Sequence, residues 1–236
     1  MRRIAAVCLF VFLAGCATYK SVPFEQSSAQ PVKTIALVKP AVTNQGPIAM
    51  LATSYGQSFG LIGLLVDAGM TGSREGTLQS ILSADGFRIQ DAVETELTTA
   101  LEEQGYTVVM VNADRGSRRE FLTTYPDTPE PVDAYLDVIV PGYGYAAAGV
   151  GDSKPWKPVA IMKTRLVRAT DNKVLMRDDI VYNRLSESRG DTVTITGDPQ
   201  YSYPDFSGLE NNRKQAAEGV RVAVRETAKT VGKLLK

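Results

Sequence analysis

A helical pattern runs directly into a strand pattern between Arg88 and Val111. In RIQDAVETELTTALEEQ, residues 88–104, apolar side chains recur at the spacing of one helical face, and Gly105 follows as a C-terminal stop. The next six residues, YTVVMV, are apolar enough for a strand that is buried on both faces. Since a helix that leads straight into a strand packs its apolar face over the sheet, this unit predicts helices packed on a sheet.

Other segments predict the rest of the sheet. Strand patterns occupy 33–39, 133–140, 159–168 and 174–183, and the residues between the last two are typical of a hairpin turn. A second amphipathic helix runs from about Asn211 to the C-terminus. The expected fold class is α/β (α+β), with a single mixed central sheet, packed helices and a long C-terminal helix.

The N-terminus has the composition of an export signal. Arg2 and Arg3 provide a positive n-region, and Ile4 to Leu13 form an apolar run about as long as a secretory h-region. A helix that crosses a bilayer needs about 20 apolar residues, so this run is too short to remain as a permanent span.

The residues that close this signal, Leu13-Ala14-Gly15-Cys16, resemble the lipobox of bacterial lipoproteins. The resemblance implies cleavage before Cys16, a diacylglycerol thioether on its sulfur and an acyl chain such as palmitate on the new amine. Ala17 stands where an aspartate would favour retention at the inner membrane. The resemblance therefore implies an anchor in the outer membrane, facing the periplasm of a diderm bacterium. An ordinary cleaved signal with an accidental cysteine is the alternative.

Such processing would divide the chain into parts. These are a signal peptide (1–15), a lipidated cysteine with a flexible tether (16–31), and a periplasmic α/β domain (32–236) with a glycine-rich insertion at about 43–84. Cys8 leaves with the signal and Cys16 is acylated, so neither cysteine remains for a disulfide. The stability of the domain must then come from packing.

The chain of 236 residues contains no histidine. Histidine is the usual general base near neutral pH and the commonest metal ligand, so its absence excludes Ser-His-Asp triads and most zinc sites. Without Arg2 and Arg3, the 26 basic residues fall to 24 against 26 acidic ones, and a net charge of −2 gives no electrostatic case for nucleic acid. We expect no enzyme, no metal and no cofactor apart from the covalent lipid.

Asp178 and Asp179 are the carboxylates considered for a hard cation. They are neighbours on a predicted strand, so their side chains point to opposite faces and do not converge on one ion. Solvent exposure is the expectation for both.

The order of elements and patterns such as ALEEQGYTVV resemble the periplasmic α/β domains of bacterial envelope lipoproteins. The similar families are the curli secretion lipoprotein and the penicillin-binding-protein activator lipoproteins, over about residues 32–236. Together with the anchor and the lack of histidine, this resemblance favours a non-catalytic binding or assembly module. Its expected partner is another envelope protein or a copy of itself.

The glycine-rich stretch GQSFGLIGLLVDAG begins at Gly56 and fits two patterns. It matches the G-x-S-x-G of hydrolase nucleophiles, but the preceding MLATSY is a poor strand and no histidine can take the proton from Ser58. The favoured alternative is a helix in which Gly56, Gly60 and Gly63 form a smooth face for close packing. A pore-forming insertion over 56–72, by analogy with the curli secretion lipoprotein, would instead make the protein an oligomeric secretion or transport component.

A second glycine-rich stretch, PGYGYAAAGVG, covers residues 141–151. Its glycine spacing differs from that of a dinucleotide-binding loop, and Pro155 and Pro158 lie where the required helix should run. A flexible turn between strands is expected.

Exposed aromatic residues are frequent anchors at protein interfaces. Trp156 lies between two lysines, and a polar stretch further on carries Tyr201, Tyr203 and Phe206. These four residues are the candidate partner-binding surface. The alternative for Trp156 is that it covers the edge of the core.

Overall fold

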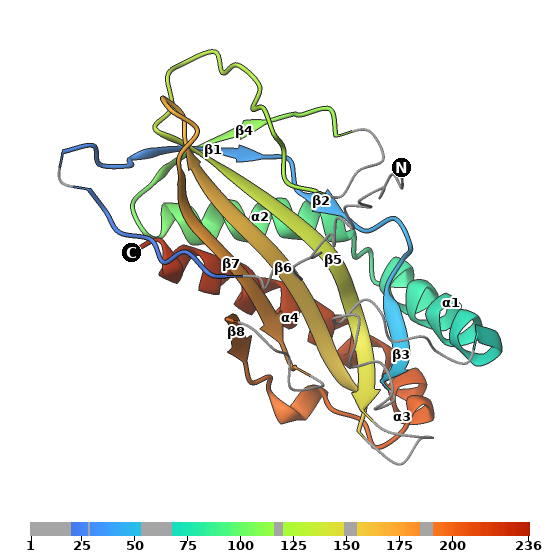
Figure 1. Ribbon diagram of the computed structural model, residues 1–236. Coiled ribbons are helices and arrows are strands. Elements are labelled where there is room, and N and C mark those ends of the chain that lie inside the picture. The colour runs from blue at the N-terminus through green and yellow to red at the C-terminus, as the bar shows by residue number, and fades with distance from the viewer. Residues whose placement is uncertain (1–19, 28, 53–67, 116–119, 149–154, 185–190) are drawn as a thin grey trace, which may run out of the picture.

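A mixed sheet forms the centre of the computed structural model, which describes residues 20–27, 29–52, 68–115, 120–148, 155–184 and 191–236 (Figure 1). Its strands are β1 (Thr34–Val38), β2 (Ala41–Val42), β3 (Ile48–Ala52), β4 (Thr107–Val111), β5 (Ala134–Ala148), β6 (Lys157–Arg168), β7 (Val174–Tyr182) and β8 (Thr192–Ile195). The order across the sheet is β4-β1-β5-β6-β7-β8, and β2 and β3 also pair with β5. The expected fold class, a mixed central sheet with packed helices, is confirmed.

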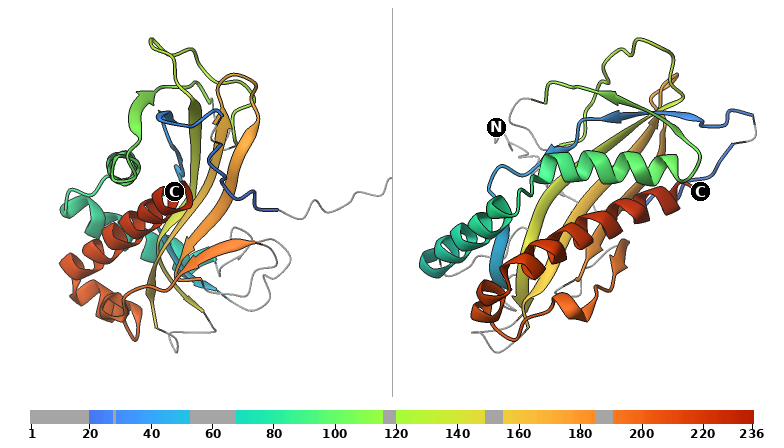
Figure 2. Two further views of the ribbon diagram at one scale, coloured as in Figure 1. Left: turned by 90° about the vertical axis from the view of Figure 1, so that its left-hand side faces the viewer. Right: turned by 180° about the vertical axis from the view of Figure 1, so that it is seen from behind.

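The helices cover one face of this sheet. They are α1 (Ala68–Ala84), α2 (Ile89–Glu102), the short 3-10 helix η4 (Pro199–Tyr201), α3 (Phe206–Asn211) and α4 (Arg213–Leu234). Figure 2 shows α2 and α4 side by side across the sheet, with α1 and α3 towards the end where β3 lies. The segment between β4 and β5 lies on the opposite, outer face.

Strand β5 pairs with strands on both of its sides. On one side β1, β2 and β3 follow one another along it in parallel, and on the other side β6 pairs with it in antiparallel register. The β5–β6 register shifts between Ile139 and Gly142. Residues 141–148 therefore continue a strand, and the expectation of a flexible turn there is wrong.

Gly144 explains why this part of β5 contains glycine. Its φ is +136°, and a Cβ at this position would lie 2.2 Å from the backbone oxygen of Ile48 in β3. Only a residue without a side chain permits this approach of the two backbones. The glycines that suggested a turn instead allow β3 to pair with β5.

The main core lies between the sheet and the helices. All six apolar positions predicted for the C-terminal helix are buried: Ala217, Val220, Val224, Ala228, Val231 and Leu235. Helix α2 likewise buries Val93, Leu97, Ala100 and Leu101. Both helices therefore use the face that their sequence periodicity predicts.

The close packing of α2 on α4 depends on a glycine. A Cβ on Gly232 of α4 would lie 2.6 Å from the backbone oxygen of Ala100 in α2. The two helices can approach this closely because Gly232 has no side chain.

The predicted β6–β7 hairpin is confirmed, and Asn172 in its turn adopts φ +57°, which asparagine tolerates better than most residues. Strand β8 was not anticipated, although TVTI has β-branched residues. It is only four residues long and pairs in parallel with β7, which it follows across a long connection. A pairing of this kind leaves little local signal.

The N-terminal segment differs from the expectation of a flexible tether. Val22 forms an antiparallel bridge with Arg177 of β7, with N–H to O distances of 2.9 Å in both directions. Phe24 packs against the main core. The chain is attached to the domain about ten residues before Val32, where the sequence predicts that the domain begins.

A membrane-spanning helix must be both long and apolar. None of the helices in the described residues has the length and the hydropathy that a span requires.

Replacing Gly232 with alanine should lower the free energy of unfolding by about 1–3 kcal/mol, because the added methyl group would force α4 away from α2. Gly76 in α1 is the matched control, since a Cβ there meets no described atom within 4 Å. Gly76→Ala should raise the free energy of unfolding by about 0.5–1 kcal/mol through helix propensity. Urea unfolding measures both variants, and equal stability of the two would contradict the close helix contact.

Candidate functional site

A buried carboxylate on the outer face of the sheet organises a network of polar contacts. Asp137 lies in β5 between Leu136 and Val138, which both belong to the main core. Because side chains alternate along a strand, Asp137 points to the opposite face. Its side chain is fully buried, with an exposed fraction of 0%.

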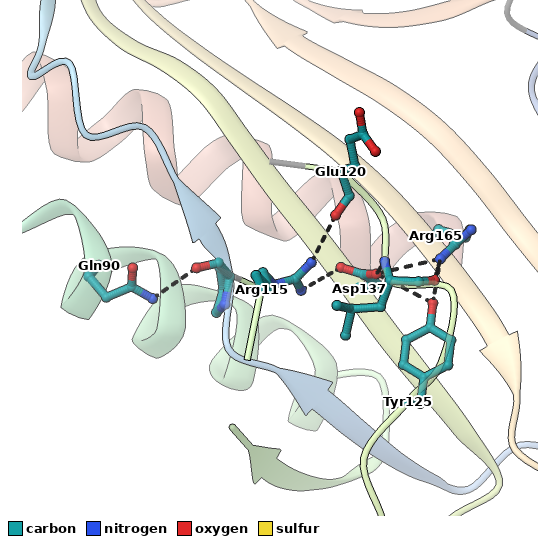
Figure 3. A network of polar contacts seen from close by, with 8 residues as sticks. Gln90, Arg115, Glu120, Tyr125, Asp137 and Arg165 are labelled. Carbon is teal, nitrogen blue, oxygen red and sulfur yellow. Dashed lines mark hydrogen bonds and ion pairs between the residues drawn. The ribbon is translucent and has the colours of Figure 1, made fainter. Parts of the chain in front are cut away.

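Four groups surround this carboxylate (Figure 3). Arg115 approaches Oδ1 at 2.6 Å, and the backbone N–H of Leu122 donates to Oδ2 over 2.8 Å. The Tyr125 hydroxyl lies 3.4 Å from Oδ2, and an Arg165 nitrogen lies 3.6 Å from the same oxygen. Both carboxylate oxygens are thus engaged by positive or donating groups.

The sheet and the segment between β4 and β5 each supply part of this network. Arg165 is the direct partner of Asp137 in the β5–β6 register. Arg115, Leu122 and Tyr125 belong to the connecting segment between the strands. Arg165 also donates to the backbone oxygen of Leu122 and, over 2.8 Å, to the hydroxyl of Tyr125. We name Arg115, Leu122, Tyr125, Asp137 and Arg165 the Asp137 clamp.

Aromatic contacts complete the clamp. The Arg165 guanidinium lies 4.7 Å from the centre of the Phe121 ring, within the range of a cation–π interaction. Tyr125 stacks on Tyr135 of β5 with ring centres 4.7 Å apart. Burial, and to a smaller extent the charge of Asp137, raise the pKa of Tyr125 to about 12. Tyr125 therefore stays a neutral hydroxyl, which can donate to Asp137 and accept from Arg165.

This arrangement holds the connecting segment onto the sheet. A general acid or base needs a lone pair or a proton that a substrate can reach, whereas Asp137 is buried and its oxygens are already bonded. The buried charge is compensated by two guanidinium groups, as a stable buried ion pair requires. The geometry supports a structural role.

Asp178 and Asp179 point to opposite faces, as their spacing predicts, but the expectation that both are solvated is wrong. Asp178 is only 6% exposed. Burial, followed by the charges of Asp179 and Asp191, raises its pKa to about 6. Asp179 is partly exposed and lies 3.9 Å from Lys163. No group of three or more metal-ligating side chains occurs within the described ranges.

The aromatic residues expected at a partner surface lie mostly in the core. Trp156 is 0% exposed, Tyr203 is 5% exposed and Phe206 is 7% exposed, so the expectation of an exposed aromatic surface is corrected. Of the four, only Tyr201 is partly exposed. Each of these residues has a polar residue on at least one side and lies in no periodic apolar pattern, so their burial does not follow from the local sequence.

The structure brings three of these aromatic residues together. Trp156 and Tyr203 exchange two backbone hydrogen bonds of 2.7 and 2.9 Å, and the Trp156 ring meets Phe206 edge-on with centres 5.0 Å apart. The guanidinium of Arg74 lies 5.3 Å from the Trp156 ring centre. The cluster joins the start of β6 to the loop before α3, which agrees with the alternative that Trp156 covers the core edge.

Other predicted sites lie outside the described residues. These are the lipidation site Cys16 and the helix-packing glycines Gly56, Gly60 and Gly63. Of the expected helix over 56–72, only its last part is described, and it belongs to α1, which continues to Ala84.

Sequence reasoning missed the Asp137 clamp, although one signal was present. An aspartate in the middle of the apolar strand sequence AYLDVIV interrupts a run that is otherwise buried. A charged residue in such a position is rarely buried without a partner. The identity of the partners depends on the path of the segment between β4 and β5, which carries no periodic pattern.

Comparisons with known proteins gave likenesses of fold only. No protein-family model matches the chain, and no curated protein sequence matches it. A solved structure from Xanthomonas campestris, described as belonging to family DUF330, is similar with a TM-score of 0.42 and 14% identity, covering 91% of each chain. A dodecamer of a PelC variant from Paraburkholderia phytofirmans has a TM-score of 0.39 and 10% identity, covering 92% of this chain and 94% of that one.

A lipoprotein from Neisseria meningitidis, GNA1162, is also similar. The TM-score is 0.28 and the identity 16%, over 63% of this chain and 81% of that one. At these scores the likenesses assign neither a family nor an activity to the chain.

Replacing Asp137 with asparagine should lower the free energy of unfolding by about 3 kcal/mol, because Arg115 and Arg165 would lose the charge that compensates them in a buried site. Amide hydrogen exchange should also accelerate around Leu122 and Tyr125. Glu130→Gln is the matched control, since this exposed side chain lies in the same segment, and its effect should stay within about 0.5 kcal/mol. A similar stability for both variants would contradict the clamp.

Asp178 should make stability depend on pH. Its pKa is about 6 in the folded state and about 3.9 when unfolded, so the folded state holds the proton more tightly. As the pH rises from about 4 to about 6, the free energy of unfolding should therefore fall by up to about 3 kcal/mol. Asp178→Asn should remove this fall and gain stability at pH 8 but not at pH 3.5. Urea unfolding between pH 3.5 and pH 8 measures this free energy. Asp127→Asn, at an exposed position, is the control. An unchanged pH profile in Asp178→Asn would show that Asp178 does not cause the pH dependence.

Proposed function

We propose that this protein is a lipid-anchored lipoprotein of the bacterial cell envelope that acts as a non-catalytic binding or assembly module. The observation that carries the proposal is the run Leu13-Ala14-Gly15-Cys16 directly behind a basic n-region and an apolar h-region. Ala17 after the cysteine supports sorting to the outer membrane, where the domain would face the periplasm.

The chemistry of the described residues supports a module without catalysis. The chain contains no histidine, and the buried carboxylate Asp137 is occupied by Arg115, Arg165 and a backbone N–H. The buried Asp137 carboxylate thus stabilises the fold. The partner that fits this setting is another envelope protein or a second copy of the chain.

The anchor can be tested by replacing Cys16 with serine. The wild-type protein should lose its first fifteen residues, carry a diacylglycerol and an acyl chain on Cys16 by mass spectrometry, and remain in the membrane fraction, because several long acyl chains give stable anchoring. Cys16→Ser should lose the lipid and leave that fraction. Cys8→Ser is the matched control, since Cys8 would be removed with the signal, and it should behave as wild type.

The same strains test the binding role. Chemical crosslinking of whole envelopes should give a discrete adduct with the lipidated protein and much less with Cys16→Ser, since the anchor keeps the module near its partner. A wild-type protein that retains its first fifteen residues or carries no lipid would contradict the anchor. An intact anchor without any adduct would contradict the binding role.

A further inference from the structure

The N-terminal residues 20–27, which we name the strap, are built into one edge of the domain. Figure 1 shows this segment passing along β7. Val22 and Arg177 exchange two backbone hydrogen bonds of 2.9 Å each. The pairing is antiparallel, so the chain before Val22 runs towards β8. There the Ser21 hydroxyl lies 3.5 Å from a carboxylate oxygen of Asp191.

Contacts on the other side of Val22 hold the strap in place. Phe24 packs against the main core. The side-chain amide of Gln26 donates to the backbone oxygen of Val32 over 3.1 Å and accepts from its backbone N–H over 3.2 Å. The strap is therefore fixed by main-chain, apolar and side-chain contacts, which together determine where the preceding residues leave the domain.

The charge differs between parts of the domain. Residues 155–184, which contain β6 and β7, carry seven basic and three acidic side chains, a net charge of +4. Residues 213–236 of the α4 region carry seven basic and two acidic ones, a net charge of +5. By contrast, residues 68–105, with α1 and α2, carry two basic and seven acidic ones, a net charge of −5.

The basic and acidic segments lie on different sides of the sheet. Helix α4 packs against β6 and β7, whereas α2 packs against β4 at the opposite edge. The strap thus joins the half of the domain that contains β6, β7 and α4, which are basic, whereas residues 191–212, with β8, carry four acidic and no basic side chains. Basic surfaces are attracted to anionic lipid headgroups, and acidic ones are repelled.

From these observations we propose that the strap, tied to Cys16 by a short leash of residues, turns the β7–β8 edge of the domain towards the lipid bilayer, with the β4 edge pointing away. This inference rests on the proposed lipid anchor at Cys16. Five residues, 17–21, separate Cys16 from Val22, and this leash reaches at most about 20 Å when fully extended. The five strand spacings from β8 to β4 span about 24 Å. A leash that begins at the β7–β8 edge is therefore too short to let the β4 edge approach the bilayer as readily.

Fluorescence quenching in vesicles tests this orientation. The lipidated protein would be reconstituted into vesicles of phosphatidylethanolamine and phosphatidylglycerol that contain a lipid with a nitroxide on its headgroup. A fluorophore would be attached to a single cysteine at one of two exposed strand positions, Thr194→Cys on β8 or Met110→Cys on β4. With Cys8 removed and Cys16 acylated, the introduced cysteine is the only free thiol.

Quenching should be about threefold or more stronger at position 194 than at position 110, because nitroxide quenching is short-ranged and the edges differ in height by about 24 Å. Equal quenching at both positions, or stronger quenching at position 110, would overturn the orientation. Mass spectrometry of the same sample separates the two proposals. A missing lipid on Cys16 refutes the anchor, whereas a present lipid with equal quenching refutes only the orientation.

Two pairs of variants test the leash itself. An insertion of about twenty glycine and serine residues after Ala17 adds roughly 70 Å of reach and should bring the quenching ratio close to one. This comparison uses about 0.5 M salt, where the Debye length is below about 5 Å and charge attraction is screened. The same insert after Lys236 is the control and should keep the ratio. A ratio that survives the longer leash would overturn the proposal.

Val22→Pro removes the N–H that Val22 donates to Arg177 and should also lower the ratio. Val22→Ala keeps both backbone hydrogen bonds and should retain it. If both variants kept the wild-type ratio, the strap would not set the orientation.

Discussion

The pairing of strand β5 is the constraint on which most of the structure depends. Its residues alternate between Leu136 and Val138 in the main core and Tyr135 and Asp137 on the outer face. Along its length it accepts β1, β2 and β3 in turn, while β6 pairs with the other side. A slip of one residue would exchange the two faces, placing Asp137 in the apolar core. The register of this one strand therefore fixes both the core and the clamp.

The buried charge of Asp137 holds a segment that lacks regular structure. The segment between β4 and β5 has few apolar residues to bury, yet a carboxylate with two guanidinium partners and a backbone N–H fixes it on the sheet. Such a site is stable only when every charge is compensated, because an unpaired buried charge costs several kcal/mol. The same compensation makes Asp137 unsuitable for catalysis, which agrees with a chain that contains no histidine.

The strap lies between the cysteine of the proposed lipid anchor and the sheet. Proline and polar residues around Val22 are typical of a linker, and composition alone predicts a tether. However, β7 extends beyond the short β8 and leaves an edge that Val22 pairs with, while Phe24 fills a position against the core. A lipid attached a few residues earlier would then act on the orientation of the whole domain as well as on its location.

Elements with strong local periodicity can be predicted from the amino-acid sequence alone. It predicted α2, α4, the β6–β7 hairpin and the mixed sheet, because the hydrophobic spacing of a helix or strand lies within the element itself. The proposed export signal and the lack of histidine also come from the sequence alone. Tertiary contacts, by contrast, bury Trp156, place Gly144 in a strand against Ile48 and surround Asp137 with its partners. These features depend on partners far away in the chain, and burial and register are set by the contacts between such segments rather than by either segment alone.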